Sequence, residues 1–251
     1  MNLLVLVSGE GPTDMGKAGQ QASEPCCGKD FEHGPMAVLV DRLIERFYSF
    51  SPIKEGLMYF VSRKELENKS KKLSKANQGR RELPSLKVPK ETAFFYNQTR
   101  ALATFANELA KIHKQTVIAV LFRDLDPKQS MNHRQRQDRW KSIVSGFKIE
   151  DFEFGIPMIP NPTSEAWLIC LFQDQPYVGC QDMENRTSES LKDQLNTLVG
   201  VKATRDILVE RLERTPPNFD RLSSAMISFK VFHDRVQEVL ECLPTTRPTP
   251  G

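Results

Sequence analysis

Apolar residues in this chain gather in short runs that do not alternate with polar residues. Such runs mark residues 3–7, 56–62, 116–127 and 154–160. A strand with one face in water alternates with a period of two, whereas a strand buried on both faces of a sheet is apolar throughout. The four runs therefore predict four buried strands of a parallel sheet.

Helical periodicity fills the intervals between these strands. Apolar side chains recur every three or four positions, and Thr163 or Ser164 is suited to cap one of the resulting helices. Residues 17–33 lack this periodicity and are predicted to form a loop. We predict helices from Pro35 onward, after residue 63, and over residues 91–114, 131–146, 163–172, 186–199, 203–213 and 219–241.

Strands that alternate with helices imply right-handed crossovers and a sheet covered on both faces. The predicted fold class is therefore α/β, a Rossmann-like core with a parallel sheet flanked by helices, followed by a helical C-terminal part. We assign residues 1–175 to the core, with a basic helical insert at about 63–115. Residues 176–243 form the predicted helical region, and residues 244–251 a predicted disordered tail.

The composition is that of a globular protein. Apolar residues make up 39% of the chain and charged residues 27%, and no apolar run approaches the ~18 residues that a membrane span needs. The first residues have a short apolar run without a basic lead, so we expect no export signal. The five irregularly spaced cysteines are then expected to be reduced thiols, which predicts a cytoplasmic protein.

Positive charge is concentrated in two segments, although the net charge is only +3. The segment from Arg63 to Lys90 contains ten Lys or Arg and three Glu, and the segment from Lys128 to Lys141 contains five Lys or Arg and one Asp. Such segments suit a polyanion, while a solvated helix face is the alternative for either segment alone. The candidate nucleic-acid-binding residues are Lys69, Lys71, Lys72, Arg80, Arg81, Arg123, Arg134 and Arg136.

Three of the predicted strands run into segments that carry acidic residues. Glu10 and Asp14 follow the first strand in "GEGPTD", and Asp124 and Asp126 end the third in "FRDLDP". Glu165 follows the fourth. The carboxyl ends of parallel strands share one edge of the sheet, where ligands bind. Asp124 and Asp126 would lie on one side of an extended backbone and repel each other without a cation, so these oxygen donors predict Mg²⁺ or Mn²⁺.

Most of these acidic residues also have a structural explanation when taken alone. An Asp-x-Asp pair is common in loops and caps, Asp14 could cap a turn, and Glu165 is favoured near a helix N-terminus. Glu10 lies between two glycines and has no comparable structural role. The five carboxylates together, at strand ends, favour a metal site.

These motifs resemble those of TOPRIM domains, the catalytic fold of type IA and II topoisomerases, bacterial primases and OLD-type nucleases. "GEGPTD" matches the Glu in a Gly-rich turn after the first strand, and "DLD" matches the Asp-x-Asp after the third. The similarity is closest to the small OLD-like and RloB-like proteins of bacterial phage defence, which carry a later stretch similar to "NPTSEAWL" (161–168). It covers about residues 3–172, and the long segment before "DLD" departs from the pattern.

The resemblance implies a metal-dependent nuclease. In that family the first-motif glutamate is a metal ligand or general base, and the aspartates hold Mg²⁺ or Mn²⁺. Two metals would bridge an in-line phosphodiester displacement. A late lysine is also expected, for which Lys230 is the candidate, with an ordinary surface lysine as the alternative. The implied catalytic and metal-binding residues are Glu10, Asp14, Asp124, Asp126 and Glu165.

We therefore expect an endonuclease that hydrolyses DNA or RNA in the bacterial cytoplasm and is controlled by a protein partner in a defence complex. Two alternatives stay open. A non-catalytic binding or inhibitory subunit of the same fold would gain no stability from Mn²⁺ through Asp124 and Asp126. A nucleotide phosphohydrolase would not need the basic segments for turnover.

Overall fold

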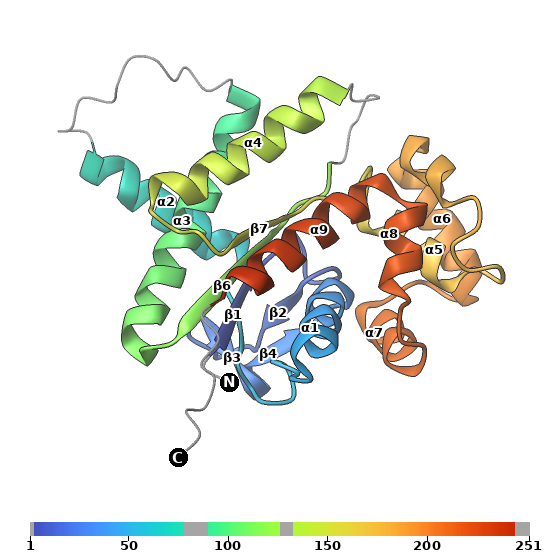
Figure 1. Ribbon diagram of the computed structural model, residues 1–251, viewed down its shortest axis with the longest axis horizontal. Helices are drawn as coiled ribbons and strands as arrows, with labels where there is room; N and C mark the ends of the chain where they lie inside the picture. The colour runs from blue at the N-terminus through green and yellow to red at the C-terminus, as the bar shows by residue number, and fades with distance from the viewer. Residues whose placement is uncertain (1–2, 78–89, 126–132, 244–251) are drawn as a thin grey trace.

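The computed structural model describes residues 3–77, 90–125 and 133–243 and has an α/β fold (Figure 1). Its central strands are β1 (Leu3–Ser8), β3 (Cys26–Cys27), β5 (Met58–Phe60), β6 (Thr116–Phe122) and β7 (Gly155–Met158). They form a five-stranded sheet in the order β3-β5-β1-β6-β7. β1, β5, β6 and β7 are parallel. β3, however, pairs antiparallel with β5. The sheet is therefore mixed, whereas we predicted a wholly parallel sheet.

The two central strands are buried on both faces, which explains their uninterrupted apolar sequence. In β1, the side chains of Leu3, Val5 and Val7 join one hydrophobic cluster. Leu4 and Leu6 join a second cluster on the opposite face. β6 divides between the two clusters in the same way. The four strands predicted from apolar runs are confirmed, and β6 ends at Phe122, before the acidic pair.

Helices cover both faces of the sheet (Figure 1). α1 (Pro35–Tyr48) and α9 (Ile227–Cys242) belong to the first cluster. α3 (Lys90–His113) and α4 (His133–Ile149) belong to the second, with α2 (Arg63–Asn77) packed against α3. The helices predicted in these intervals are confirmed, and α1 begins with Pro at its first position, where the missing N–H costs nothing.

The C-terminal helices share the core of the sheet. They are α5 (Ser164–Phe172), α6 (Ser188–Val199), α7 (Arg205–Arg214) and α8 (Phe219–Ala225), with the 3₁₀ helix η2 (Cys180–Asn185) before α6. Trp167 of α5 is fully buried, its ring lies 5.7 Å from that of Phe232, and its N–H donates to Ser228 Oγ at 2.8 Å. One hydrophobic cluster thus continues across residue 175, where we predicted a boundary.

Residues 17–33, predicted to be a loop, contain short regular elements. β2 (Gly16–Ala18) pairs antiparallel with β4 (Phe31–His33), and β3 and the 3₁₀ helix η1 (Gly28–Asp30) lie between them in sequence. The loop prediction is therefore wrong in part. Strands of two or three residues are too short to display a periodicity.

The single helix predicted over residues 219–241 is two helices. Met226 has an extended backbone (φ −138°, ψ 121°) and separates α8 from α9. Its side chain is only 1% exposed. The apolar pattern therefore continues across the break, which periodicity alone does not reveal.

The expectation that all cysteines are reduced is wrong for two of them. Cys170 of α5 and Cys180 of η2 form a disulfide, with their Cα atoms 5.5 Å apart. A turn in which the Tyr177 N–H donates to the Cys170 carbonyl at 3.1 Å brings the two together. The other three cysteines are free. Cysteine usage therefore no longer supports the cytoplasmic expectation.

Within the described ranges, no helix has the combined length and hydrophobicity that a bilayer crossing requires. The predicted disordered tail, residues 244–251, lies outside these ranges.

The turn after β1 is fastened to the start of α1. The Gly34 N–H donates to the Met15 carbonyl at 3.0 Å, and the Met36 N–H donates to the Asp14 carbonyl at 3.0 Å. A Cβ atom on Gly34 would lie 2.2 Å from the Asp14 carbonyl oxygen, so only glycine fits without movement of the backbone. This contact fixes the backbone that carries the Asp14 side chain.

Gly34→Ala is expected to lower the free energy of unfolding by about 1–3 kcal/mol, the usual cost of overpacking, because its methyl group would displace the turn. Urea denaturation measures the change. Gly19→Ala is the matched control, since a Cβ there would meet its nearest atom at an ordinary 3.7 Å. Equal stability of the two variants would contradict the close packing of Gly34 against Asp14.

Candidate functional site

Three segments of the chain bring acidic side chains to the carboxyl edge of the sheet. The turn after β1 carries Glu10 and Asp14. β6 runs in register beside β1 as far as the pairing of Ser8 with Leu121, so Asp124 emerges next to this turn. β7 lies beside β6, and the chain continues from β7 into α5, whose first turn carries Glu165.

Ser164, the first residue of α5, binds two of the acidic side chains. Its hydroxyl donates to Asp14 Oδ1 at 2.5 Å, and its backbone N–H donates to Asp124 Oδ1 at 3.0 Å. Thr163 is the N-cap residue, but its side chain makes no capping bond. The N–H groups at a helix start are unpaired within the helix and favour negative charge. The start of α5 therefore joins the ends of β1 and β6.

Burial and mutual repulsion raise the pKa of both aspartates. The pKa of Asp14 rises to about 6, mainly through burial, which the Ser164 hydrogen bond opposes and the charges of Glu165 and Glu10 reinforce. The pKa of Asp124 is raised well above its usual range by burial and then by Asp14, Glu165 and Glu10. Carboxyl groups that shift one another in this way lie in an excess of negative charge.

Several buried polar atoms at this edge lack a hydrogen-bond partner among the described residues. They are Ser8 Oγ at the end of β1, Thr163 Oγ1 and Glu165 Oε2. Buried polar groups in proteins are paired with protein, water or ligand as a rule. The two atoms at the start of α5 therefore mark it as a place where a further polar group would be stabilised.

The described residues hold no ready metal centre made of three or more His, Cys, Asp or Glu side chains. Asp126, the second acid of "DLD", lies outside the described residues. Carboxylates repel one another when no cation lies between them. We therefore expect these carboxylates to lie farther apart in the protein alone than they would around a bound cation. The donors are all carboxylate oxygens, which Mg²⁺ and Mn²⁺ prefer. In chemistry, the site fits a hard divalent cation.

Arg123, a predicted nucleic-acid-binding residue, lies inside the protein. Its side chain is fully buried. The guanidinium donates twice to Gln98 Oε1, with Nε at 2.8 Å, and once to the Phe122 carbonyl at 2.6 Å. Its Nε lies 3.8 Å from Glu10 Oε1. Burial lowers the pKa of Arg123 to about 10, so it stays charged at neutral pH. The geometry favours a structural ion pair, in which Arg123 orients Glu10, over contact with nucleic acid.

Two lysines bear on the prediction of a late lysine near the acidic cluster (Glu10, Asp14, Asp124 and Glu165). Lys230 is an exposed residue of α9 whose ammonium pairs with Asp234 at 2.6 Å. The charge of Lys192, an exposed residue of α6, lowers the pKa of Asp14. Lys192 sits in an ordinary amphipathic helix and has no motif around it. Only the packing of α6 against α5 brings it to the site.

The other predicted nucleic-acid-binding residues differ in their surroundings. Lys69 of α2 pairs with Glu108 at 2.5 Å and lies 4.8 Å from the centre of the Phe105 ring, so it helps pack α2 on α3. Lys71 and Lys72 of the same helix are exposed. The remaining ones lie outside the described residues or have side chains outside them: Arg80, Arg81, Arg134 and Arg136.

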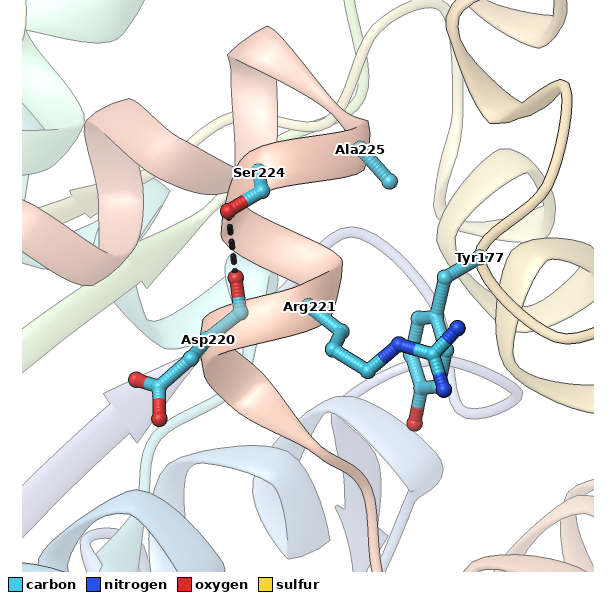
Figure 2. Close-up of a pocket in the computed structure, with 5 residues that line it drawn as sticks. All are labelled: Tyr177, Asp220, Arg221, Ser224 and Ala225. Atoms are coloured by element: carbon cyan, nitrogen blue, oxygen red, sulfur yellow. Dashed lines mark hydrogen bonds between the residues drawn. The ribbon is translucent and has the colours of Figure 1, made fainter.

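A hollow of about 340 Å³ lies apart from the carboxylates, between α8 and Tyr177. In Figure 2 the Arg221 guanidinium lies against the Tyr177 ring, 4.8 Å from its centre, and the Ser224 hydroxyl donates to the Asp220 carbonyl at 2.9 Å. The Asp220 carboxylate pairs with Arg46 at 2.6 Å. Because these groups already have partners within the protein, this hollow is less suited to a polar ligand than the carboxyl edge.

The chain matches no protein-family model, no curated protein and no solved structure. The TOPRIM resemblance therefore stays a prediction, and the functional proposal depends on the geometry of the carboxyl edge.

Asp124→Asn is expected to stabilise the cation-free protein at pH 7.5. A carboxyl group whose pKa is raised by folding binds its proton more tightly in the folded state, so its contribution to stability falls as the pH rises from the unfolded pKa through the folded pKa. Asparagine keeps an acceptor for the Ser164 N–H without the charge. Calorimetry in EDTA should give a higher Tm at pH 7.5, by roughly 2–4 °C per kcal/mol relieved, and a smaller difference near pH 4.

Asp206→Asn is the control for this measurement, because Asp206 is an exposed carboxylate on α7 with 81% of its side chain accessible. Its Tm should follow that of the wild type at both pH values. A lower Tm for Asp124→Asn than for the wild type at pH 7.5 would show that the folded carboxylates do not repel one another.

Proposed function

We propose that the chain is a Mg²⁺- or Mn²⁺-dependent endonuclease with a TOPRIM-like core that hydrolyses phosphodiester bonds in DNA or RNA. The observation that carries the proposal is the meeting of carboxylates from β1, β6 and α5 at one edge of the sheet, with Asp14 and Asp124 both bound to Ser164. Ligands of parallel α/β sheets bind at this edge.

A divalent cation at this edge would be held by Asp14, Asp124 and Glu165, with Glu10 and Asp126 as further oxygen donors. The buried, unpaired Glu165 Oε2 supports this donor set. Once bound, such a cation would promote deprotonation of a water molecule and offset the charge of the phosphodiester.

The protein side chains have separate roles in this proposal. Ser164 orients the two aspartates through its two hydrogen bonds. Arg123 orients Glu10 through an ion pair in which Nε lies 3.8 Å from Glu10 Oε1. Glu10 would accept a proton from the attacking water. A bond forms between the water oxygen and phosphorus, the bond from phosphorus to the leaving oxygen breaks, and the leaving oxygen takes up a proton from solvent.

The position of α2 favours a nucleic acid over a free nucleotide as substrate. α2 follows β5 directly and therefore begins at the same edge of the sheet as Glu10. Its exposed residues Lys71 and Lys72 are suited to sequence-independent contact with a phosphate backbone, with an affinity that falls as salt rises. A free nucleotide would not extend along such a helix.

The test of this proposal is incubation of the purified chain with supercoiled plasmid, linear duplex, single-stranded DNA and tRNA, each with Mg²⁺, Mn²⁺ or EDTA. We expect cleavage that needs the metal and that falls about a hundredfold or more in Asp124→Asn, the loss typical when a group that stabilises the transition state is removed. The Asp124→Ala/Asp126→Ala variant should be inactive, and Asp206→Asn should cleave as the wild type does.

Two results would contradict the proposal. Metal-dependent cleavage that is unchanged in Asp124→Asn and Glu10→Gln would place the active site elsewhere. Absence of cleavage on every substrate, together with no Mn²⁺-induced rise in Tm that depends on Asp124, would favour the non-catalytic alternative.

Lys192→Met is expected to lower cleavage at pH 7 by about 1.4- to fivefold, from the ~0.2–1 kcal/mol typical of an exposed charge interaction. Without Lys192 the pKa of Asp14 rises further, so the rise of activity with pH should shift to higher pH. Lys148→Met is the control, since Lys148 is in the last turn of α4, just before β7 begins, at the opposite edge of the sheet. If Lys230→Met shifted the pH dependence of cleavage and Lys192→Met did not, the result would contradict the role of Lys192 and favour Lys230, the lysine predicted from the sequence.

A further inference from the structure

A hollow of about 490 Å³ adjoins the acidic cluster and is separate from the hollow of Figure 2. One wall is the glycine-rich turn after β1, which includes Glu10. A second wall is formed by β2 with Lys17, and a third by the end of β5 and the start of α2 with Arg63 and Lys64. Its volume lies within the ~300–1,000 Å³ range of small-molecule sites.

The sheet order places this hollow next to the proposed site of cleavage. β5 lies on one side of β1 and β6 lies on the other. The hollow adjoins the carboxyl end of β5, whose last residue Phe60 is part of its lining. Asp124 instead follows β6, on the other side of β1. Glu10 lines the hollow and also contributes to the raised pKa values of Asp14 and Asp124. The hollow and the acidic cluster are therefore consecutive along one edge, with Glu10 at their boundary.

Three cationic side chains in the hollow outnumber its two carboxylates, Glu10 and Glu24, so its net charge suits an anion. Arg63, Lys64 and Lys17 are exposed there. Lys64 has no ion-pair partner among the described residues. The Arg63 guanidinium pairs with Glu67 at 2.9 Å and Lys17 with Glu32 at 3.4 Å, in both cases between side chains at least 41% exposed. Such exposed pairs are worth little, so a phosphate group can replace the carboxylate partner.

One backbone donor in the lining already has a carboxylate of the protein as its partner. The Glu24 carboxylate accepts a hydrogen bond from the Ser62 backbone N–H, immediately before α2. Two partly exposed glycines in the lining, Gly11 and Gly19, carry no side chain that would keep a ligand from the backbone. The hollow therefore combines exposed cationic side chains, an accessible backbone at Gly11 and Gly19, and room for a group the size of one nucleotide.

We propose that this hollow binds the nucleotide next to the scissile phosphate, with Arg63 and Lys64 pairing with its phosphate. This inference rests on the proposed function and adds the place of the substrate strand, which would run along the sheet edge from the acidic cluster toward β5. It also assigns phosphate binding to the first turn of α2 rather than to Lys69. The Arg63 guanidinium lies 5.0 Å from the centre of the Phe94 ring of α3, but its side chain is 47% exposed, against 20% for Lys69.

The probe is thymidine 3′,5′-bisphosphate, which carries a phosphate on each side of one nucleoside, as a nucleotide within a strand does, and has no internucleotide bond to cleave. Binding is measured by isothermal titration calorimetry with the full chain, once in EDTA and once with Ca²⁺. We expect Arg63→Glu/Lys64→Glu to weaken binding by at least about tenfold, which corresponds to ~1.4 kcal/mol. Unphosphorylated thymidine should bind far more weakly than the bisphosphate.

The matched control is Lys111→Glu/Lys148→Glu, which makes the same change of charge at two exposed lysines. These lysines precede β6 and β7 and lie at the opposite edge of the sheet. Binding by this variant should stay within about twofold of the wild type, the range of long-range charge effects at moderate salt. The neutral variant Arg63→Gln/Lys64→Gln should bind with intermediate affinity, and thermal melting checks that all variants fold.

The outcomes separate this inference from the proposed function. Equal affinity of the wild type and Arg63→Glu/Lys64→Glu, or no binding by the wild type in either EDTA or Ca²⁺, overturns the inference even if the chain cleaves nucleic acid. Equal weakening in the variant and the control overturns it as well, because only net charge would then matter. Binding that depends on Arg63 and Lys64 in a chain without cleavage activity supports the binding site and contradicts the nuclease.

Discussion

The carboxyl edge of the sheet depends on one constraint: acidic side chains from separate segments have to stay together against their own repulsion. The two hydrogen bonds of Ser164 meet this constraint, because they join Asp14 to Asp124 through the start of α5. α5 can hold the two aspartates in place because it is buried on nearly every side, with Trp167 packed against α9. Burial, and after it the charges of the neighbouring carboxylates, raises the pKa values of the two aspartates. A divalent cation would offset both the loss of hydration and the repulsion.

The same edge is supported from the opposite face of the sheet. Arg123 is buried, donates a hydrogen bond to Gln98 of α3 and forms an ion pair with Glu10. α3 in turn packs against α2 through Lys69. Basic residues of this protein thus divide into two groups, those that fix the acidic cluster or the helices in place, and those such as Lys64 and Lys71 that face solvent. Counting charges along the chain does not distinguish the two groups.

The helices after residue 175 are part of this arrangement rather than an appendage. α9 packs on β7, α6 packs on α5, and their apolar residues belong to the hydrophobic cluster that includes one face of β1 and β6. The C-terminal helices therefore secure the position of α5, and with it the geometry of Asp14 and Asp124. A divalent cation bound as proposed would add stability at this group of carboxylates.

The sequence by itself determined the elements whose physical signal is local. Continuous apolar runs gave β1 and β6 because a strand buried on both faces needs apolar residues on both, and helical periodicity gave α1, α3 and α4. It also predicted that five carboxylates would share an edge, since parallel strands end on the same side. Four of them, Glu10, Asp14, Asp124 and Glu165, are among the described residues, and Asp126 lies outside these. Only the tertiary structure decided the rest. β2, β3 and β4 are too short to show a period, the break at Met226 is hidden under a continuous apolar stripe, and the Cys170–Cys180 disulfide depends on a turn. The burial of Arg123, the double hydrogen bond of Ser164 and the effect of Lys192 on the pKa of Asp14 depend on the packing of segments far apart in sequence. A local pattern carries no information about such packing.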